Sequence, residues 1–223
     1  HGVGDLFGRR RGLFDLPDRL RWTAGMVAQW AESDSLRAAA RQRVLEQVEK
    51  FQPAVICAHS LGSLIGYDLF GRKQHQAAIA GRTFVSFGSQ IGNPFVRSAL
   101  GGRIKELAQA RMWYHLFNPQ DDAFTARIRL QAENFCKVET DFDIEVILDH
   151  DALAYLKHPQ TTAMVWREVA GGPAARAFTE RVRQFKPAIK RAQRRALLVG
   201  INDYPDEAHR LEGCVNDVFL MSS

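Results

Sequence analysis

The stretch Ala54–Tyr67 constrains the fold of this chain more than any other. It begins with an apolar run, Ala54–Cys57, which follows Pro53. An unbroken apolar run of this length is typical of a strand that is buried on both faces. Small residues then flank Ser60 in the order Ala-His-Ser-Leu-Gly, and an apolar helical pattern starts directly afterwards. The stretch therefore predicts a buried strand, a sharp turn with a serine at its tip, and a helix.

The serine turn has the residue types that a nucleophile elbow requires. The residues two before and two after Ser60 are small, Ala58 and Gly62, because so tight a turn leaves no room for larger side chains. We expect strained backbone angles at Ser60, which push its hydroxyl out at the end of the sheet. Backbone N–H groups of the following helix would face a developing oxyanion. The alternative is an exposed serine in an ordinary strand-to-helix turn, since alanine replaces the first glycine of G-x-S-x-G.

Helical and strand-like segments alternate along the chain, which is typical of an α/β fold with a mostly parallel sheet and helices on both faces. A helix is predicted from an N-cap at Ser33 or Ser35 to Gln52. Further strands are expected at 82–90, 112–117 and 135–142, the last near a sheet edge, and further helices at 103–110 and 161–169. The end of the strand at 82–90 carries Ser86, Gly88 and Ser89, which we expect to line the rim of the serine site.

A serine nucleophile needs an acid and a base, here in the chain order Ser, acid, His. Asp121 and Asp122 lie on the loop after the strand 112–117, where such a carboxylate belongs. The simpler alternative is that both aspartates are only solvated residues of a turn.

Two histidines compete for the position of the base. His150 lies on a loop just before a helical pattern, whereas His158 precedes a proline and resembles a helix end. We favour His150. His75 and His115 come too early for the chain order, and the side chain of His59 should point away from the serine hydroxyl.

The charge and the cysteines exclude several classes of protein. The net charge is +5, but much of the basic excess falls within 176–195, which predicts a local linker and not a nucleic-acid-binding domain. Cys57, Cys136 and Cys214 are scattered and show neither a disulfide framework nor a zinc spacing, so we expect a reducing, cytoplasmic compartment. No transmembrane run and no signal peptide are visible, and no metal or cofactor is expected.

Residues 1–170 resemble the lipase/esterase branch of the α/β-hydrolase family. The resemblance is carried by His1-Gly2-Val3-Gly4, Ala58-His59-Ser60-Leu61-Gly62, Asp121 and His150. In that family a His-Gly loop follows the third strand and contributes to the oxyanion hole. The resemblance therefore implies an α/β-hydrolase sheet whose N-terminal strands are missing from the sequence.

The same resemblance implies a role for each site residue. Ser60 would be the nucleophile, His150 the base, and the backbone N–H groups of Val3 and Leu61 the oxyanion hole. The lipase-like pattern Asn-Pro-x-Asp-Pro-Val has its acid at the fourth residue, which is Asp121, and places proline where this chain has Asp122. Asp121 is therefore favoured as the triad acid.

Residues 195–223 resemble the opening of a caspase-like domain of the metacaspase type (peptidase C14), after a basic linker at 171–194. The resemblance is carried by Ala196-Leu197-Leu198-Val199-Gly200-Ile201-Asn202 and Leu211-Glu212-Gly213-Cys214-Val215-Asn216-Asp217. The catalytic residues of that family lie further downstream, so Cys214 should not be the nucleophile. We expect a truncated second domain that cannot itself be a peptidase.

Together the two resemblances imply a serine hydrolase that acts on small-molecule or lipid esters and forms one module of a larger protein. Its partner would be its own downstream caspase-like domain. The alternative hypothesis is a catalytically degenerate hydrolase fold that serves as a recognition or scaffold module and regulates the caspase-like effector.

Overall fold

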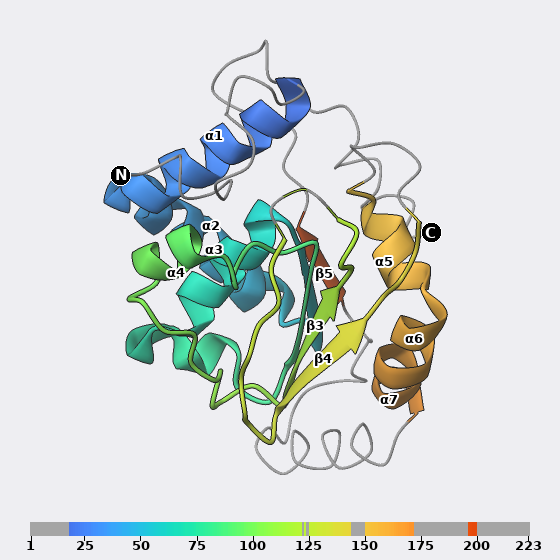
Figure 1. The fold of residues 1–223 in the computed structure, drawn as a ribbon. Coiled ribbons are helices and arrows are strands. Elements are labelled where there is room, and N and C mark those ends of the chain that lie inside the picture. The colour runs from blue at the N-terminus through green and yellow to red at the C-terminus, as the bar shows by residue number, and fades with distance from the viewer. Residues whose placement is uncertain (1–17, 122, 124, 144–149, 172–195, 200–223) are drawn as a thin grey trace.

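A parallel sheet forms the centre of the molecule. The computed structural model describes residues 18–121, 123, 125–143, 150–171 and 196–199. In these ranges five strands lie in the order β4-β3-β2-β1-β5, and each neighbouring pair is parallel (Figure 1). The strands are β1 Val55–His59, β2 Thr83–Phe87, β3 Met112–Phe117, β4 Phe135–Glu139 and β5 Ala196–Val199. This confirms the α/β class and the mostly parallel sheet.

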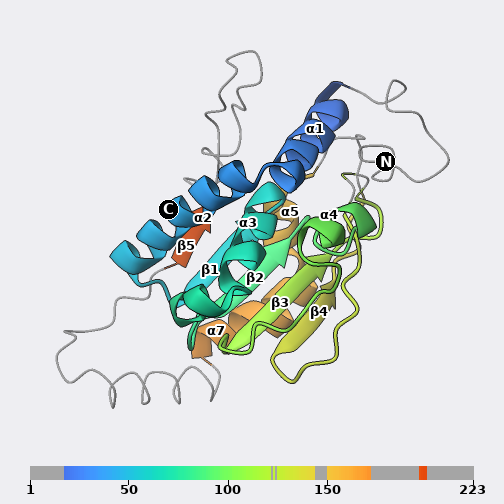
Figure 2. The same ribbon diagram turned by 90° about the vertical axis from the view of Figure 1, so that its left-hand side faces the viewer.

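Helices cover both faces of this sheet. One face carries α1 Asp18–Glu32, α2 Asp34–Phe51, α3 Leu61–Phe70 and α4 Pro94–Ala99, with the 3-10 helix η4 Lys73–Ala78 beside them. The opposite face carries α5 Ala152–Lys157, α6 Pro159–Thr161, the π-helix η5 Thr162–Trp166 and α7 Arg167–Gly171. Figure 2 shows the first group in front of the strands and α5 and α7 behind them.

The strands are buried on both sides because their side chains alternate between two hydrophobic cores. Ile56, Phe84 and Trp113 join the core under α1–α4. Cys57 and Val85, which are their neighbours in sequence, join the core under α5 and η5. The continuous apolar run that predicted a doubly covered strand is therefore explained by helices on each side.

Helix α2 begins and ends at the residues that its sequence predicts. The Ser33 side chain accepts a hydrogen bond from Leu36 N at 3.2 Å, which selects Ser33 over Ser35 as the N-cap. At the other end Gln52 takes the left-handed conformation with φ 47°, and Pro53 follows it. The chain then enters β1 directly, so α2 leads into the strand that carries the serine turn.

The helix predicted at 103–110 is absent from the structure. The segment is held in an irregular conformation by side chains from elsewhere: Lys105 N donates to Tyr67 Oη at 2.7 Å, and Asn134 Nδ2 donates to the carbonyls of Leu107 and Ala110. These tertiary contacts replace the hydrogen bonds that a helix would have made within the segment.

Strands β4 and β5 form the two edges of the described sheet. The expectation that the strand at 135–142 lies near an edge is confirmed, although β4 already ends at Glu139. The strand expected after residue 195 is present as β5 and pairs with β1, with Ala196 opposite Val55. The division of the chain into 1–170, 171–194 and 195–223 remains a prediction.

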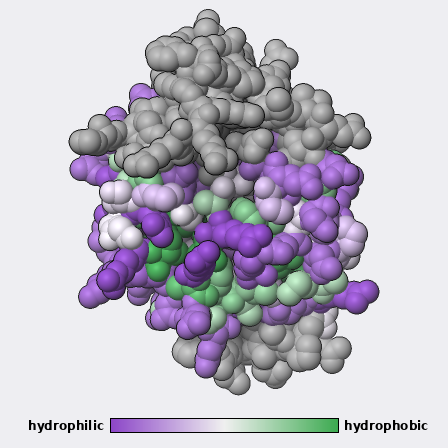
Figure 3. Space-filling model, in the orientation of Figure 1, coloured by the Kyte–Doolittle hydropathy of each residue, from purple (hydrophilic) through white to green (hydrophobic). Residues whose placement is uncertain are grey.

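The surface in the orientation of Figure 1 is largely polar. Figure 3 shows hydrophilic side chains over most of the coloured face, with smaller apolar areas between them. Among the helices that the structure describes, none is both long and apolar enough to cross a lipid bilayer.

The loop after β2 packs tightly on the segment that follows the loop after β3. Ala126 N donates to Ser89 O at 3.1 Å. A Cβ atom placed on Gly92 would lie 2.4 Å from Arg127 O, well inside the distance at which a non-bonded carbon can contact an oxygen. The absence of a side chain at Gly92 therefore allows the two loops to meet.

We predict that Gly92→Ala lowers the free energy of unfolding by about 1–3 kcal/mol, because the methyl group forces two backbone segments apart. Gly25→Ala is the matched control. Gly25 lies in α1, and a Cβ atom added there would have nothing within 4 Å, so alanine should stabilise the helix by about 0.5–1 kcal/mol. Urea unfolding followed by far-UV circular dichroism measures both. Equal midpoints for Gly92→Ala and the wild type would contradict the prediction.

Candidate active site

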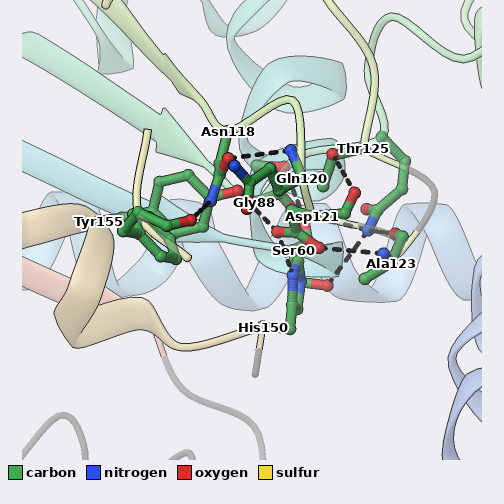
Figure 4. A network of polar contacts seen from close by, with 12 residues as sticks. Ser60, Gly88, Asn118, Gln120, Asp121, Ala123, Thr125, His150 and Tyr155 are labelled. Atoms are coloured by element: carbon green, nitrogen blue, oxygen red, sulfur yellow. Dashed lines mark hydrogen bonds and ion pairs between the residues drawn. The ribbon is translucent and has the colours of Figure 1, made fainter. Parts of the chain in front are cut away.

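The structure gathers three of the predicted site residues at the carboxyl ends of the parallel strands. Ser60 directly follows β1, Asp121 lies on the loop after β3, and His150 directly precedes the N-cap of α5. Figure 4 shows them within one network of polar contacts. The carboxyl end is the edge at which parallel α/β sheets commonly place their ligands.

The backbone at Ser60 has the strain that the sequence predicts. Its φ of 49° and ψ of −126° are unusual for a residue with a side chain, and such a conformation costs about 1–3 kcal/mol. Ser60 N donates to Phe87 O on the neighbouring strand at 3.1 Å, which fixes the turn against the sheet. Helix α3 begins immediately afterwards at Leu61, and first-turn N–H groups of a helix have no acceptor within it. The strand, the tight turn and the helix of the elbow are thus all present.

Asp121 and His150 form a hydrogen-bonded pair. The Nδ1 atom of His150 lies 2.7 Å from Oδ2 of Asp121. The Asp121 side chain is only 2% exposed, so the carboxylate needs such partners to remain charged. Asp122, the competing acid, lies outside the described residues. Of the two neighbours, Asp121 is therefore the one for which a contact with His150 is established.

Two further donors hold the Asp121 carboxylate. Tyr155 Oη donates to Oδ2 at 2.6 Å, and Ala123 N donates to Oδ1 at 3.0 Å. Burial by itself raises the pKa of Asp121, but the hydrogen bond and charge of His150, with the bonds from Tyr155 and Ala123, outweigh it and lower the pKa below its usual value. The site thus keeps an ionised acid beside its histidine.

The loop that carries Asp121 is itself held at several points. Asn118 is fully buried; its Oδ1 accepts from Gln120 N, and its Nδ2 donates to Phe142 O, both at 2.9 Å. Thr125 Oγ1 donates to the Asp121 carbonyl at 2.9 Å. The position of the carboxylate is therefore set by the loop as well as by its own hydrogen bonds.

Gln90 connects this loop to the serine. Its Nε2 atom lies 2.9 Å from Ala123 O and 3.5 Å from Ser60 Oγ, and the residue is completely buried. His150 Nε2 is buried and has no hydrogen-bond partner among the described residues. The serine–histidine hydrogen bond of a triad is thus not made here, and such bonds commonly tighten only when a substrate is bound.

Two other histidines considered for the position of the base, His158 and His115, have different partners. His158 Nδ1 accepts from Gln160 N at 3.2 Å at the start of α6, and its Nε2 lies 3.3 Å from Asp141 Oδ1. His115 is buried within β3, where Nδ1 lies 3.1 Å from Ser86 Oγ, and burial lowers its pKa to about 4. His150 is the histidine that the structure places against Asp121.

Two of the three residues expected at the rim of the site are buried, Ser86 within β2 and Ser89 on the loop that follows it. Ser86 Oγ accepts from Trp113 Nε1 at 2.9 Å, and Ser89 Oγ accepts from Ser63 Oγ at 2.6 Å. Both serines satisfy polar groups within the fold and do not line the rim. Gly88 alone adjoins the site: a Cβ atom there would lie 2.6 Å from Cε1 of His150.

Sequence reasoning did not assign three residues that contact the site. Tyr155, five residues after His150, lies one helical turn into α5 and reaches Asp121, a contact that its place in the sequence does not reveal. Gln90 follows β2 without any motif around it. His59 stacks against Phe87 with ring centroids 5.1 Å apart, and its ring lies beside His150.

Val3, the second predicted oxyanion donor, lies outside the described residues. Within the ranges that the structure covers, no three or more His, Cys, Asp or Glu side chains are grouped so that they could hold a metal ion. Comparison of the chain with protein-family models, with curated proteins and with solved structures found no match.

We predict that Tyr155→Phe lowers the free energy of unfolding by about 1.5–3 kcal/mol at pH 7, because it removes a hydrogen bond to a buried charged group. Tyr67→Phe is the matched control: that hydroxyl makes two hydrogen bonds to the uncharged Lys105 backbone, away from the site, and their loss should cost about 1–3 kcal/mol. Urea unfolding gives both values. A Tyr155→Phe variant as stable as the wild type would show that the hydroxyl does not support the carboxylate.

The stability contributed by Asp121 should depend on pH. Its pKa is lower in the folded protein than the usual 3.8, so the ionised carboxylate stabilises the fold fully above about pH 5. This contribution is lost as the pH falls through the folded-state pKa. We predict that the difference in free energy of unfolding between the wild type and Tyr155→Phe becomes smaller below about pH 4. The difference between the wild type and Tyr67→Phe should stay the same. Urea unfolding at pH 7 and pH 3 tests this, and a Tyr155→Phe difference that is constant with pH would contradict it.

Proposed function

We propose that the chain is a serine hydrolase that cleaves carboxylic esters, with Ser60 as nucleophile, His150 as base and Asp121 as acid. One observation carries this proposal: a buried, ionised Asp121 is hydrogen-bonded to His150 at the strand ends, beside a serine on a strained strand-to-helix turn. A strained serine turn costs stability, and acyl transfer explains why it occurs beside a buried acid–histidine pair.

In the proposed mechanism the Ser60 Oγ–H attacks the acyl carbonyl and forms an Oγ–C bond, while its proton passes to His150 Nε2. Asp121 accepts the hydrogen bond of His150 Nδ1–H throughout and stabilises the imidazolium. The C–O bond to the alcohol then breaks, and the alcohol leaves with the proton from His150. Water attacks the acyl-enzyme by the same route in reverse, which releases the acid and restores Ser60.

The negative charge of the tetrahedral intermediate requires donors near the serine. Leu61 N–H, at the start of α3, is the donor that we propose within the described structure, and Val3 N–H is the second by resemblance to the lipase/esterase pattern. Each such donor is typically worth about 100- to 1,000-fold in turnover. The substrate class that this arrangement supports is a small-molecule or lipid ester.

The cellular location of the protein and its association with a second domain are also proposals. A reducing, cytoplasmic location agrees with Cys57 and Cys136, which are both free thiols. We further propose, from sequence resemblance, that residues 195–223 open a caspase-like domain and that the hydrolase works as one module with it. In that setting a hydrolase fold that only recognises a ligand is the second candidate.

The test is hydrolysis of p-nitrophenyl esters with short and long acyl chains. We predict that Ser60→Ala and His150→Ala each lower kcat/KM by at least about 1,000-fold. Ser98→Ala, an exposed serine of α4, and His75→Gln, in η4, are the matched controls and should keep wild-type rates.

A fluorophosphonate probe separates the enzyme from the recognition module. Covalent labelling of the folded chain that disappears in Ser60→Ala and persists in Ser98→Ala supports the serine hydrolase. A folded chain that neither reacts with the probe nor cleaves any ester is evidence against the enzyme and favours the recognition module.

A further inference from the structure

Two imidazole rings lie in contact, with their planes tilted, next to the candidate nucleophile. The ring centroids of His59 and His150 are 4.3 Å apart, with 36° between the ring planes. His59 is the last residue of β1 and directly precedes Ser60, so its backbone is fixed by strand pairing with Phe87. A second imidazole with no place in the proposed mechanism therefore touches the proposed base.

The His59 ring is one member of a closed circuit of contacts. It stacks on Phe87, whose ring centroid lies 6.0 Å from that of Tyr155. Tyr155 Oη binds Asp121, and Asp121 binds His150, which completes the circuit at His59. His150 is thus held at its Nδ1 edge by a hydrogen bond and on one face by a ring that the sheet anchors.

Gly88 provides the space in which both imidazoles fit. A Cβ atom at this position would lie 2.6 Å from Cε1 of His150 and 2.8 Å from Nε2 of His59. The backbone there has φ of 51°, a left-handed conformation that glycine adopts without strain. The close approach and the backbone conformation both require glycine, because any side chain would push the rings apart.

From this geometry we infer that His59 is a positioning residue for His150: its neutral ring packs against one face of the catalytic imidazole and fixes the direction in which His150 Nε2 points. A hydrogen bond at Nδ1 alone leaves an imidazole free to rotate about that bond. The adjacent His59 ring limits this rotation. This inference rests on the proposed function of His150 as the base.

The lowered pKa of His59 agrees with a packing role for this residue and argues against a role as a second base. Burial, and then the charge of His150, lower the pKa of His59 far below its usual value, and the opposing effect of Asp121 is smaller. His59 therefore stays uncharged when His150 takes the serine proton. Its Nε2 atom, like that of His150, is buried with no hydrogen-bond partner in the described structure.

The test compares His59→Ala, which removes the ring, with His59→Phe, which keeps a flat ring of similar size. We predict that His59→Ala lowers kcat for a p-nitrophenyl ester by about 10- to 100-fold and leaves KM within about twofold, since a small misplacement of a catalytic group affects chemistry more than binding. His59→Phe should recover most of this loss. His115→Ala removes another buried imidazole of the sheet and should affect stability but not kcat.

A proton NMR spectrum reports the position of His150 independently of activity. The Nδ1–H proton of a histidine bonded to a buried carboxylate resonates far downfield and is visible only while exchange is slow. We expect this resonance in the wild type and in His59→Phe, and its broadening or loss in His59→Ala. Its absence in Asp121→Asn would assign it.

If His59→Ala does not fold, Gly88→Ala tests the same contact from the other side. Gly101→Ala is the matched control, because Gly101 also has a left-handed φ, of 86°, but open space around its Cβ position. Loss of the downfield resonance in Gly88→Ala and its retention in Gly101→Ala support the inference.

Two results would overturn the inference. One is a His59→Ala variant with wild-type kcat and an intact resonance; the other is a His59→Phe variant as impaired as His59→Ala, which would assign the effect to the ring nitrogens. Failure of the proposed function can be distinguished from failure of this inference. If the chain is not an esterase, no activity that depends on Ser60 will be found. The NMR comparison still shows whether His59 holds His150 in place.

Discussion

The strained turn at Ser60 is the constraint on which the rest of the structure depends. A residue with φ of 49° and ψ of −126° persists only where strong contacts on both sides hold it. Strand β1, which is buried between two cores, holds it from one side, and α3 with its buried apolar face holds it from the other. The hydrogen bond from Ser60 N to Phe87 O then ties the turn to β2. Two hydrophobic cores thus maintain one serine in an unfavourable backbone conformation.

The acid and the histidine are placed by a different kind of interaction. Their loops lack regular backbone hydrogen bonding, so side-chain hydrogen bonds hold them in place. Asn118 accepts a hydrogen bond within the turn before Asp121, and Tyr155 donates to the Asp121 carboxylate from α5. Gln90, which follows β2, donates to the carbonyl of Ala123 on the same loop. Because these groups are buried, each missing partner would leave an unpaired polar atom, which is costly. The polar network is therefore cooperative, and this explains how loops can carry a site that needs close alignment.

The ring contacts couple these two parts of the site. His59 belongs to β1, whereas His150 directly precedes the N-cap of α5, and both rings lie against Gly88. The segments that carry Ser60 and His150 are thus linked through packing as well as through hydrogen bonds. If His150 is the base that we propose, this packing limits its rotation even without a serine–histidine hydrogen bond.

The sequence by itself determined the parallel strands, helix α2 with its cap at Ser33, and the strained serine turn, because these depend on local periodicity and on neighbouring residues. It also limited the candidates for the acid of the predicted site to Asp121 and Asp122, and it favoured His150 over His158 as the candidate base. Only the tertiary structure joined Asp121 to His150, placed Tyr155 and Gln90 beside them, and brought the His59 ring against that of His150. Tertiary contacts also left 103–110 without the expected helix. These are contacts between residues far apart in the chain or set by a side-chain direction, and local sequence patterns carry no information about which distant groups will meet.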